Sequence, residues 1–335
     1  MIEWLDTADR RSPWSELRVV VAGLGARGYS AADVLVELGA EVVVLDDSET
    51  HTDEAKLLEI LGAEVRRDAD GLPSCDLVVA SDEWPVSSSR LREAEQRGVP
   101  VWSDAELAWR LRQPDRVVPW LGVTGTRGSQ TAAAMLESML AAAGLTACAV
   151  GMDGRPILET VLDEVSYDVL AVAMSRTDLG RTGSARFHSA AVLTVETDGG
   201  EDEDGGQYAR IYHQVTHSCV YNAGEPRTEA MVEDADVVEG ARAIGITAGI
   251  PAISMLGVVD EYLVDRAFIP QRKDSALELA LCSDVPPGPG MLIDALAAAG
   301  LARSFGIPAT AVRDGLRGFD PGRPRTDPHT DQGET

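Results

Sequence analysis

Basic residues are scarce in this sequence. Of its 335 residues, 29 are Lys or Arg and 55 are Asp or Glu, so the formal net charge at pH 7 is −26. An acidic surface is repelled by nucleic acid and by anionic membranes. The composition therefore argues against both classes of partner.

Long apolar runs are also missing. No run reaches the roughly 18 residues that a transmembrane helix needs. The N-terminus, MIEWLDTADRR, is acidic and has no signal-peptide core. The four cysteines are far apart and form no CxxC pair, which is typical of reduced thiols. These absences predict a cytoplasmic protein.

Common catalytic and metal motifs are absent as well. The sequence contains no GxSxG elbow and no HExxH pair. His213 and His217 are four residues apart, but no third ligand follows at a suitable spacing. We therefore expect no metal site.

The first glycine-rich turn follows an apolar stretch at 18–22. It reads Gly23-Leu-Gly25-Ala-Arg-Gly28, and a helical pattern (29–38) and a second apolar stretch (41–45) ending at Asp46 come after it. This order predicts a Rossmann-like unit. The GxGxxG spacing alone is a weak signal. Contact with a nucleotide or nucleotide-sugar, and a purely structural tight turn, both remain open interpretations.

A second glycine loop lies in the stretch LGVTGTRGSQTAAAML, residues 121–136. An apolar run enters the loop and an alanine-rich helical pattern leaves it, which is the layout of a phosphate cradle. A P-loop needs Lys followed by Ser or Thr. Here Ser129 and Gln130 stand at those positions.

Strand-like and helix-like stretches alternate along most of the chain, which predicts an α/β fold with a mostly parallel sheet covered on both faces. We expect a Rossmann-like N-terminal domain (1–113) and a central P-loop-type α/β domain (114–319). A strand is predicted at 116–121 and a helix at 131–143, and Asp104 is the predicted N-cap of another helix. The tail (320–335) is rich in Pro, Asp and Thr and is predicted to be disordered.

Several stretches together resemble the Mur ligase family, most closely its MurD type, in the family's order and spacing. They are GLGARGYSAADVL, LVVAS, VWSDAELAWRL, GVTGTRGSQTAAAMLESMLAAAGL, AVGMDGRPILETVL, YDVLAVAMS, AAVLTV, VYNAGEPRTE and ALAAAGLARSFGIPATAVRDGLRGF. The resemblance implies the fold of an ATP-dependent ligase, the enzyme that joins D-glutamate to UDP-N-acetylmuramoyl-L-alanine. It also implies a first domain that receives the UDP-sugar. The candidate UDP-sugar contacts are Gly25, Ala26, Arg27, Gly28, Asp46 and Ser81.

The resemblance also identifies a phosphate-loop remnant, formed by Gly125, Thr126, Arg127, Gly128, Ser129, Gln130 and Thr131. Ser129 replaces the family's phosphate-binding lysine, and Gln130 replaces its magnesium-binding hydroxyl residue. A neutral serine and a glutamine amide are poor substitutes beside phosphates. Arg127 would partly restore the charge if it pointed inward, although such a residue more often points to solvent.

Other functional positions of the family are replaced too. Met152 stands for an asparagine, Ala173 for a magnesium-binding glutamate and Gly199 for a histidine. The carbamylated lysine falls at Gln207 or Tyr208. The family's His-Asn pair matches Gly290 and Met291, and the chain stops about where a third domain should start.

These losses predict a catalytically inactive MurD-type paralogue with a regulatory, binding or accessory role. ATP and magnesium are the family's cofactors, and we expect neither to bind productively. A protein partner or a UDP-sugar is the expected ligand. Two alternatives stay open: an ATP-dependent amide ligase with a rearranged or partner-completed site, and a UDP-sugar binding module.

Overall fold

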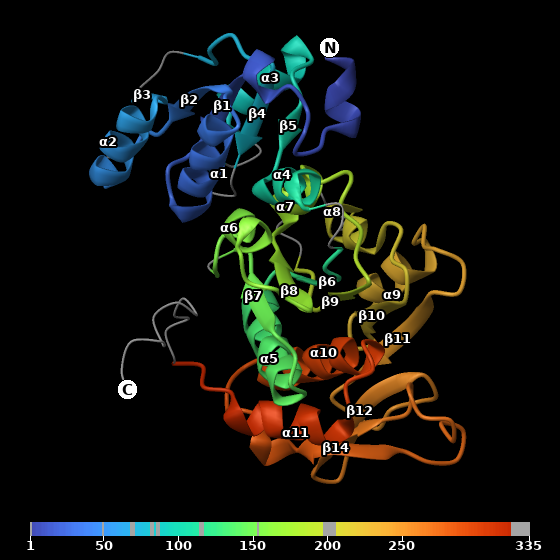
Figure 1. The fold of residues 1–335 in the computed structure, drawn as a ribbon. Helices are drawn as coiled ribbons and strands as arrows, with labels where there is room; N and C mark the ends of the chain where they lie inside the picture. The colour runs from blue at the N-terminus through green and yellow to red at the C-terminus, as the bar shows by residue number, and fades with distance from the viewer. Residues whose placement is uncertain are drawn as a thin grey trace, which may run out of the picture.

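The computed structural model describes residues 2–48, 50–67, 71–80, 84, 88–113, 117–152, 154–196 and 206–322. Two sheets organise this part of the chain, one with five strands and one with nine (Figure 1). We call the elements around the five-stranded sheet the first domain and those from β6 onward the central domain. The predicted α/β fold is confirmed.

The five-stranded sheet is wholly parallel, with strand order β3-β2-β1-β4-β5. Its inner strands are valine-rich and buried on both faces, as expected of a parallel sheet covered by helices. The strands are β1 (Arg18–Ala22), β2 (Glu41–Leu45), β3 (Glu64–Arg66), β4 (Leu77–Ala80) and β5 (Val101–Trp102). The helices are η1 (Glu3–Thr7), η2 (Trp14–Glu16), α1 (Ala26–Glu37), α2 (Thr52–Leu61), α3 (Ser89–Arg97) and α4 (Asp104–Leu111).

The nine-stranded sheet has the order β14-β13-β12-β11-β10-β9-β6-β8-β7. It is parallel from β7 to β12, and β13 and β14 add an antiparallel edge. The strands are β6 (Trp120–Thr124), β7 (Ala147–Val150), β8 (Val169–Met174), β9 (Ser189–Val192), β10 (Ser218–Asn222), β11 (Arg242–Ile246), β12 (Met255–Val259), β13 (Tyr262–Asp265) and β14 (Leu277–Leu281).

Helices cover both faces of this sheet. The helices are α5 (Ser129–Ala142), α6 (Ile157–Leu162), α7 (Arg176–Gly180), α8 (Gly206–Ala209), η3 (Arg210–Tyr212), α9 (Pro226–Glu233), η4 (Cys282–Asp284), α10 (Met291–Ser304) and α11 (Ala309–Gly318). Leu121 and Val123 of β6 pack with α5, α10 and α11. Trp120 packs on the other face, with α6, α7, η3 and α9, because successive strand residues alternate between faces.

The core of the first domain continues into the central domain. One apolar cluster includes Trp14 and Trp102 on one side and Trp120 and Phe187 on the other. The rings of Trp109 and Trp120 meet edge to face, with centroids 4.9 Å apart, a favoured aromatic geometry. The two domains are therefore joined by an apolar contact, and Figure 1 shows α4 lying directly above α7 and α6 at this junction.

Three local predictions were wrong. The strand predicted at 116–121 begins at Trp120, because Val117 is 70% exposed and the buried run starts later. Ser103, not Asp104, is the N-cap of α4, and its Oγ accepts a hydrogen bond from the Glu106 backbone N–H at 3.0 Å. The helix predicted at 131–143 starts two residues earlier, at Ser129.

The four cysteines are all free thiols, as predicted. Burial raises the pKa of Cys219 to about 12 and that of Cys148 to about 11, so both stay protonated and unreactive at neutral pH. No helix in the described ranges is long and apolar enough to cross a bilayer. Residues 323–335 lie outside the described residues, so the disorder of the tail stays a prediction.

Candidate functional site

The phosphate-loop remnant joins the end of β6 to the start of α5. Gly125 and Gly128 both have positive φ, +153° and +86°, and Gly128 is the N-cap of α5. These are backbone conformations that favour glycine. The Thr126 N–H donates to the Thr194 carbonyl oxygen at 2.7 Å. The loop is therefore docked on the segment after β9, and one of its N–H groups is already used.

Neutral side chains occupy the two positions where a P-loop needs its lysine and its hydroxyl residue. Ser129 is 3% exposed, and its Oγ donates to the Gly125 carbonyl oxygen at 3.4 Å. The Nε2 atom of Gln130 lies 2.7 Å from the place of a Cβ on Gly154, so this amide is turned toward the loop after β7. Neither side chain brings a charge to the loop.

Arg127 does not restore the missing charge inside the loop. Its guanidinium pairs with the carboxylate of Glu196, and the two side chains are 74% and 50% exposed. The Glu196 N–H in turn donates to the Thr126 Oγ1 at 2.9 Å. The structure thus places Arg127 on the outer surface of the loop, the orientation expected of such a residue.

Sequence reasoning missed a carboxylate beside the loop. Asp294 lies in the first turn of α10 and is 7% exposed. Its carboxylate packs so closely on Gly128 that a Cβ there would collide with it. No hydrogen bond to this carboxylate is found within the described residues, and burial raises its pKa to about 6. At neutral pH the loop therefore faces a resident negative charge.

The other replaced positions also carry no metal-binding group. Ala173 is buried in β8, and Tyr208 is buried in the apolar cluster beneath α8. Met152 has a positive φ of +43°. Gly290 is the N-cap of α10, and Met291 packs on the core. In the described part of the chain, no group of three or more His, Cys, Asp or Glu residues is placed to hold a metal ion. Gly199 lies outside the described residues.

The first-domain glycine turn has the expected backbone. Gly25 is the N-cap of α1, and Ala26 begins the helix. A Cβ on Gly28 would collide with the Gly23 carbonyl oxygen, so the turn requires glycine there. Asp46 is 5% exposed and forms an ion pair or hydrogen bond with His51 Nδ1 at 2.9 Å. Ser81 lies outside the described residues.

The side chain of Arg27 binds residues outside this turn. Its Nε donates to Asp104 Oδ2 at 2.9 Å, and its Nη2 donates to Asp178 Oδ1 at 2.7 Å. The three side chains are 8%, 3% and 1% exposed. Asp178 also caps α7 through Ser175, whose Oγ donates to it at 2.8 Å. We call Arg27, Asp104 and Asp178 the interdomain clamp.

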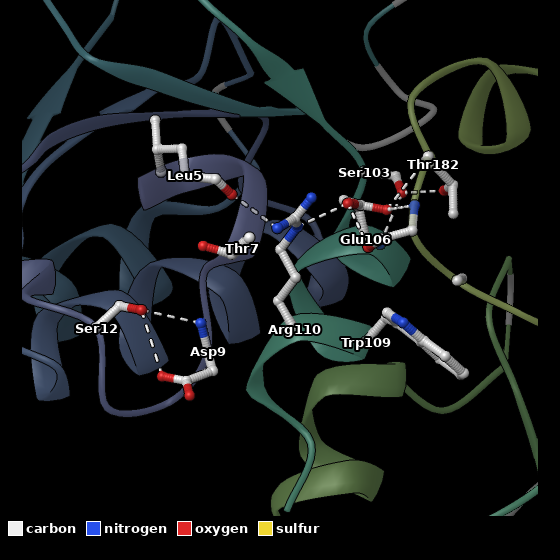
Figure 2. A network of polar contacts seen from close by, with 12 residues as sticks. Leu5, Thr7, Asp9, Ser12, Ser103, Glu106, Trp109, Arg110 and Thr182 are labelled. Carbon is white, nitrogen blue, oxygen red and sulfur yellow. Dashed lines mark hydrogen bonds and ion pairs between the residues drawn. The ribbon is translucent and has the colours of Figure 1, made fainter. Parts of the chain in front are cut away.

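A second polar network lies beside the clamp. Glu106 accepts hydrogen bonds from the Gly183 and Ser184 N–H groups at 2.9 Å each and from Arg110 Nε at 2.7 Å. Burial raises its pKa, but the bonds from Ser184 and the charge of Arg110 outweigh this and leave the pKa lowered. Figure 2 shows Arg110 between Glu106 and the Leu5 carbonyl oxygen, with Ser103 beside Thr182. The interdomain clamp and the Glu106 network thus hold the first domain against the central domain at two adjacent places.

Comparison with known proteins identifies the family. A protein of Streptomyces avermitilis named UDP-N-acetylmuramoylalanine–D-glutamate ligase is 48% identical over 318 residues, which cover 92% of this chain and 68% of that protein. The protein of the same name from Streptomyces coelicolor is 48% identical over 322 residues, with the same coverage. The chain belongs to the MurD-type Mur ligases. No family model matches the chain.

Solved structures support the fold of this MurD-type chain. A UDP-N-acetylmuramate:L-alanyl-γ-D-glutamyl-meso-diaminopimelate ligase from Neisseria meningitides has a TM-score of 0.58 at 17% identity and covers 92% of this chain and 99% of its own. A murein peptide ligase from Psychrobacter arcticus has a TM-score of 0.53 at 15% identity, with coverage of 90% and 68%. The family predicted from the quoted stretches is confirmed.

Proposed function

We propose that this MurD-type chain does not catalyse phosphoryl transfer and acts by binding. The proposal rests on one observation: the loop that should neutralise phosphates holds a buried neutral Ser129, with the carboxylate of Asp294 packed against Gly128. Phosphoryl transfer depends almost entirely on positioning and on charge neutralisation of the phosphates. A negative charge at this place opposes both ATP and the developing transition state.

The residues present do not fit Mg-ATP. One oriented electrostatic donor contributes roughly 3–4 kcal/mol to a transition state, and here the lysine position is neutral. Ala173 presents only a methyl group within β8. Gln130 is directed toward Gly154, and an amide is a poor partner for a hard cation beside phosphates. We therefore derive no step that involves ATP or magnesium.

We propose that the chain has a regulatory, binding or accessory role. The first domain keeps its glycine turn at Gly23–Gly28 and the buried Asp46, which supports a UDP-sugar as one ligand and leaves a protein partner as the other. Arg27 serves the interdomain clamp, so a diphosphate would be held by backbone N–H groups. We propose the cytoplasm as the site of action.

A second candidate function is the ligase activity itself, the addition of D-glutamate to UDP-N-acetylmuramoylalanine. It is favoured by the 48% identity, over 92% of this chain, to relatives that carry the name of that enzyme. This candidate needs positive charge at the loop from a rearranged segment or from another chain.

Phosphate release separates the two candidates. The purified protein is incubated with Mg-ATP, UDP-N-acetylmuramoyl-L-alanine and D-glutamate, and calorimetry measures the binding of Mg-ATP and of the UDP-sugar separately. We expect no phosphate release above the no-protein background. Turnover that requires all three substrates would overturn the proposal. Saturable binding of the UDP-sugar alone would identify the chain as a UDP-sugar binding module.

A further inference from the structure

A hollow of about 860 Å³ lies on the face of the large sheet that α7, α8 and α9 cover. Its volume falls within the range of small-molecule pockets. It shares no lining residue with the phosphate loop. Residues 182–187 form one wall and lead into the amino end of β9, whereas the phosphate loop follows the carboxyl end of the parallel strand β6. The hollow is therefore a separate feature of the fold.

Three arginines line this hollow, which we call the arginine pocket: Arg186, Arg210 and Arg227. The Nη1 of Arg186 donates to the carbonyl oxygens of Gly183 and Ala185, both at 2.9 Å. The Nη2 of Arg210 donates to the Thr182 carbonyl oxygen at 3.2 Å. These bonds tie two guanidiniums to the same wall and leave most of their N–H donors for another acceptor, since each guanidinium carries five.

None of these three guanidiniums pairs with a carboxylate of the described residues. This is unexpected in a chain with 55 acidic and 29 basic residues. Arg27, Arg110 and Arg303, by contrast, each pair with a carboxylate. Guanidiniums that line one hollow without a paired carboxylate are suited to bind an oxyanion from outside.

The remaining lining of the arginine pocket is mixed. Phe187, Leu179 and Met231 contribute apolar surface and are 2%, 2% and 6% exposed. At another part of the wall, His213 Nδ1 lies 3.4 Å from Asp236 Oδ2. Such a pocket combines charged donors with an apolar floor, the composition that orients an amphipathic ligand.

We propose that the arginine pocket binds a small organic oxyanion with an apolar or aromatic body. The phosphate or carboxylate group of the ligand contacts Arg186, Arg210 and Arg227, and its body lies over Phe187 and Met231. The acidic wall at Asp236 repels a second negative group, so the ligand carries its charge at one end. This site is independent of the proposed function at the phosphate loop.

Three matched naphthalene probes test the site by calorimetry: 1-naphthyl phosphate, 1-naphthoate and neutral 1-naphthol. We expect saturable one-to-one binding of at least one anion and weaker binding of 1-naphthol. Arg227→Gln and Arg186→Gln should each weaken the anion about five- to tenfold, the effect of one charge-assisted hydrogen bond. The tighter of the two anions identifies phosphate or carboxylate as the preferred head group.

Arg92→Gln is the control, because Arg92 is an exposed arginine of α3 in the first domain. Arg227→Gln removes no contact found within the described residues, so it separates ligand binding from folding. A thermal melt checks that Arg186→Gln remains folded. Equal affinity for 1-naphthol and the anions would overturn the proposal. So would loss of affinity in Arg92→Gln as large as in Arg227→Gln, or the absence of saturable binding.

Discussion

At the scale of single residues, Asp294 and Arg27 show how side-chain direction decides the chemistry of a glycine-loop backbone. The glycine loops have the backbone that their motifs predict, with Gly28 and Gly128 at positions that exclude a Cβ. The side chains beside the loops determine which charges the loops face. Asp294 brings a carboxylate to one loop, and Arg27 leaves the other to join two buried aspartates.

Asp294→Asn should change stability in a pH-dependent way. The folded-state pKa is raised from 3.8 to about 6, so the group favours the folded state while it is protonated. This contribution is present below pH 4 and is lost as the pH rises through 6. The asparagine variant should equal the wild type in unfolding free energy near pH 4 and exceed it by about 3 kcal/mol at pH 7. Urea unfolding at both pH values measures the difference, and a pH-independent difference would contradict the assignment.

Restoring the loop chemistry should restore nucleotide binding. The triple variant Ser129→Lys, Gln130→Thr, Asp294→Asn replaces a neutral group with an ammonium and removes the opposing carboxylate. We expect Mg-ATP affinity to rise by at least about tenfold, measured by calorimetry. Arg127→Gln is the control and should leave affinity unchanged, because Arg127 is held outside the loop by Glu196. An unchanged affinity in the triple variant would mean that the loop backbone itself cannot accept a triphosphate.

At the scale of secondary-structure elements, the junction between α1, α4 and α7 depends on charge. Asp104 begins α4 and Asp178 lies in the first turn of α7, where a carboxylate is favourable to the helix dipole. Arg27 of α1 pairs with both, and its single positive charge balances one of the two negative charges. Without it two carboxylates would remain buried at the domain junction, and burying an unpaired charge is costly.

Arg27→Met should therefore destabilise the protein by about 3–5 kcal/mol, the usual effect of breaking a buried ion pair from one side. Thermal or urea unfolding measures this loss. Arg66→Met is the matched control, because Arg66 pairs with Glu64 on the surface and its loss should be barely detectable. Part of the stability should return in Arg27→Met combined with Asp178→Asn. Equal losses of stability in Arg27→Met and Arg66→Met would show that the clamp is not buried in solution.

The elements and the two glycine loops could largely be predicted from the sequence, but the distant side chains that pack against those loops could not. Valine-rich stretches such as 18–22 and 41–45 are typical of buried strands, and the glycines after them mark the turns. The start of β6 was misplaced because Val117 looks like a strand residue but is exposed. Asp294 and Asp178 were missed because their partners, Gly128 and Arg27, lie more than a hundred residues away, and no local pattern carries that information.

At the scale of the whole molecule, the shared core determines how the protein unfolds. One apolar cluster runs from Trp14 in the first domain to Phe187 in the central domain. The edge-to-face pair of Trp109 and Trp120 lies at the junction. Domains with a continuous apolar contact of this kind lose stability together.

Calorimetric unfolding should accordingly show one transition for both domains. Trp120→Ala should lower its midpoint without splitting it, at a cost of about 3–5 kcal/mol for a buried Trp. Trp84→Ala, at a half-exposed position, serves as the control for the loss of an indole ring. Two resolved transitions in the wild type would show that the domains are energetically independent.

The interdomain clamp also has a consequence for how this sequence can change over generations. Arg27 and Asp178 are 151 positions apart, yet loss of Arg27 alone leaves both Asp178 and Asp104 buried without their cation. A replacement of Arg27 should therefore occur together with a second replacement in the clamp. Among relatives of this chain, loss of the arginine at the second residue of α1 should be accompanied by loss of the acid at the first residue of α4 or at the third residue of α7.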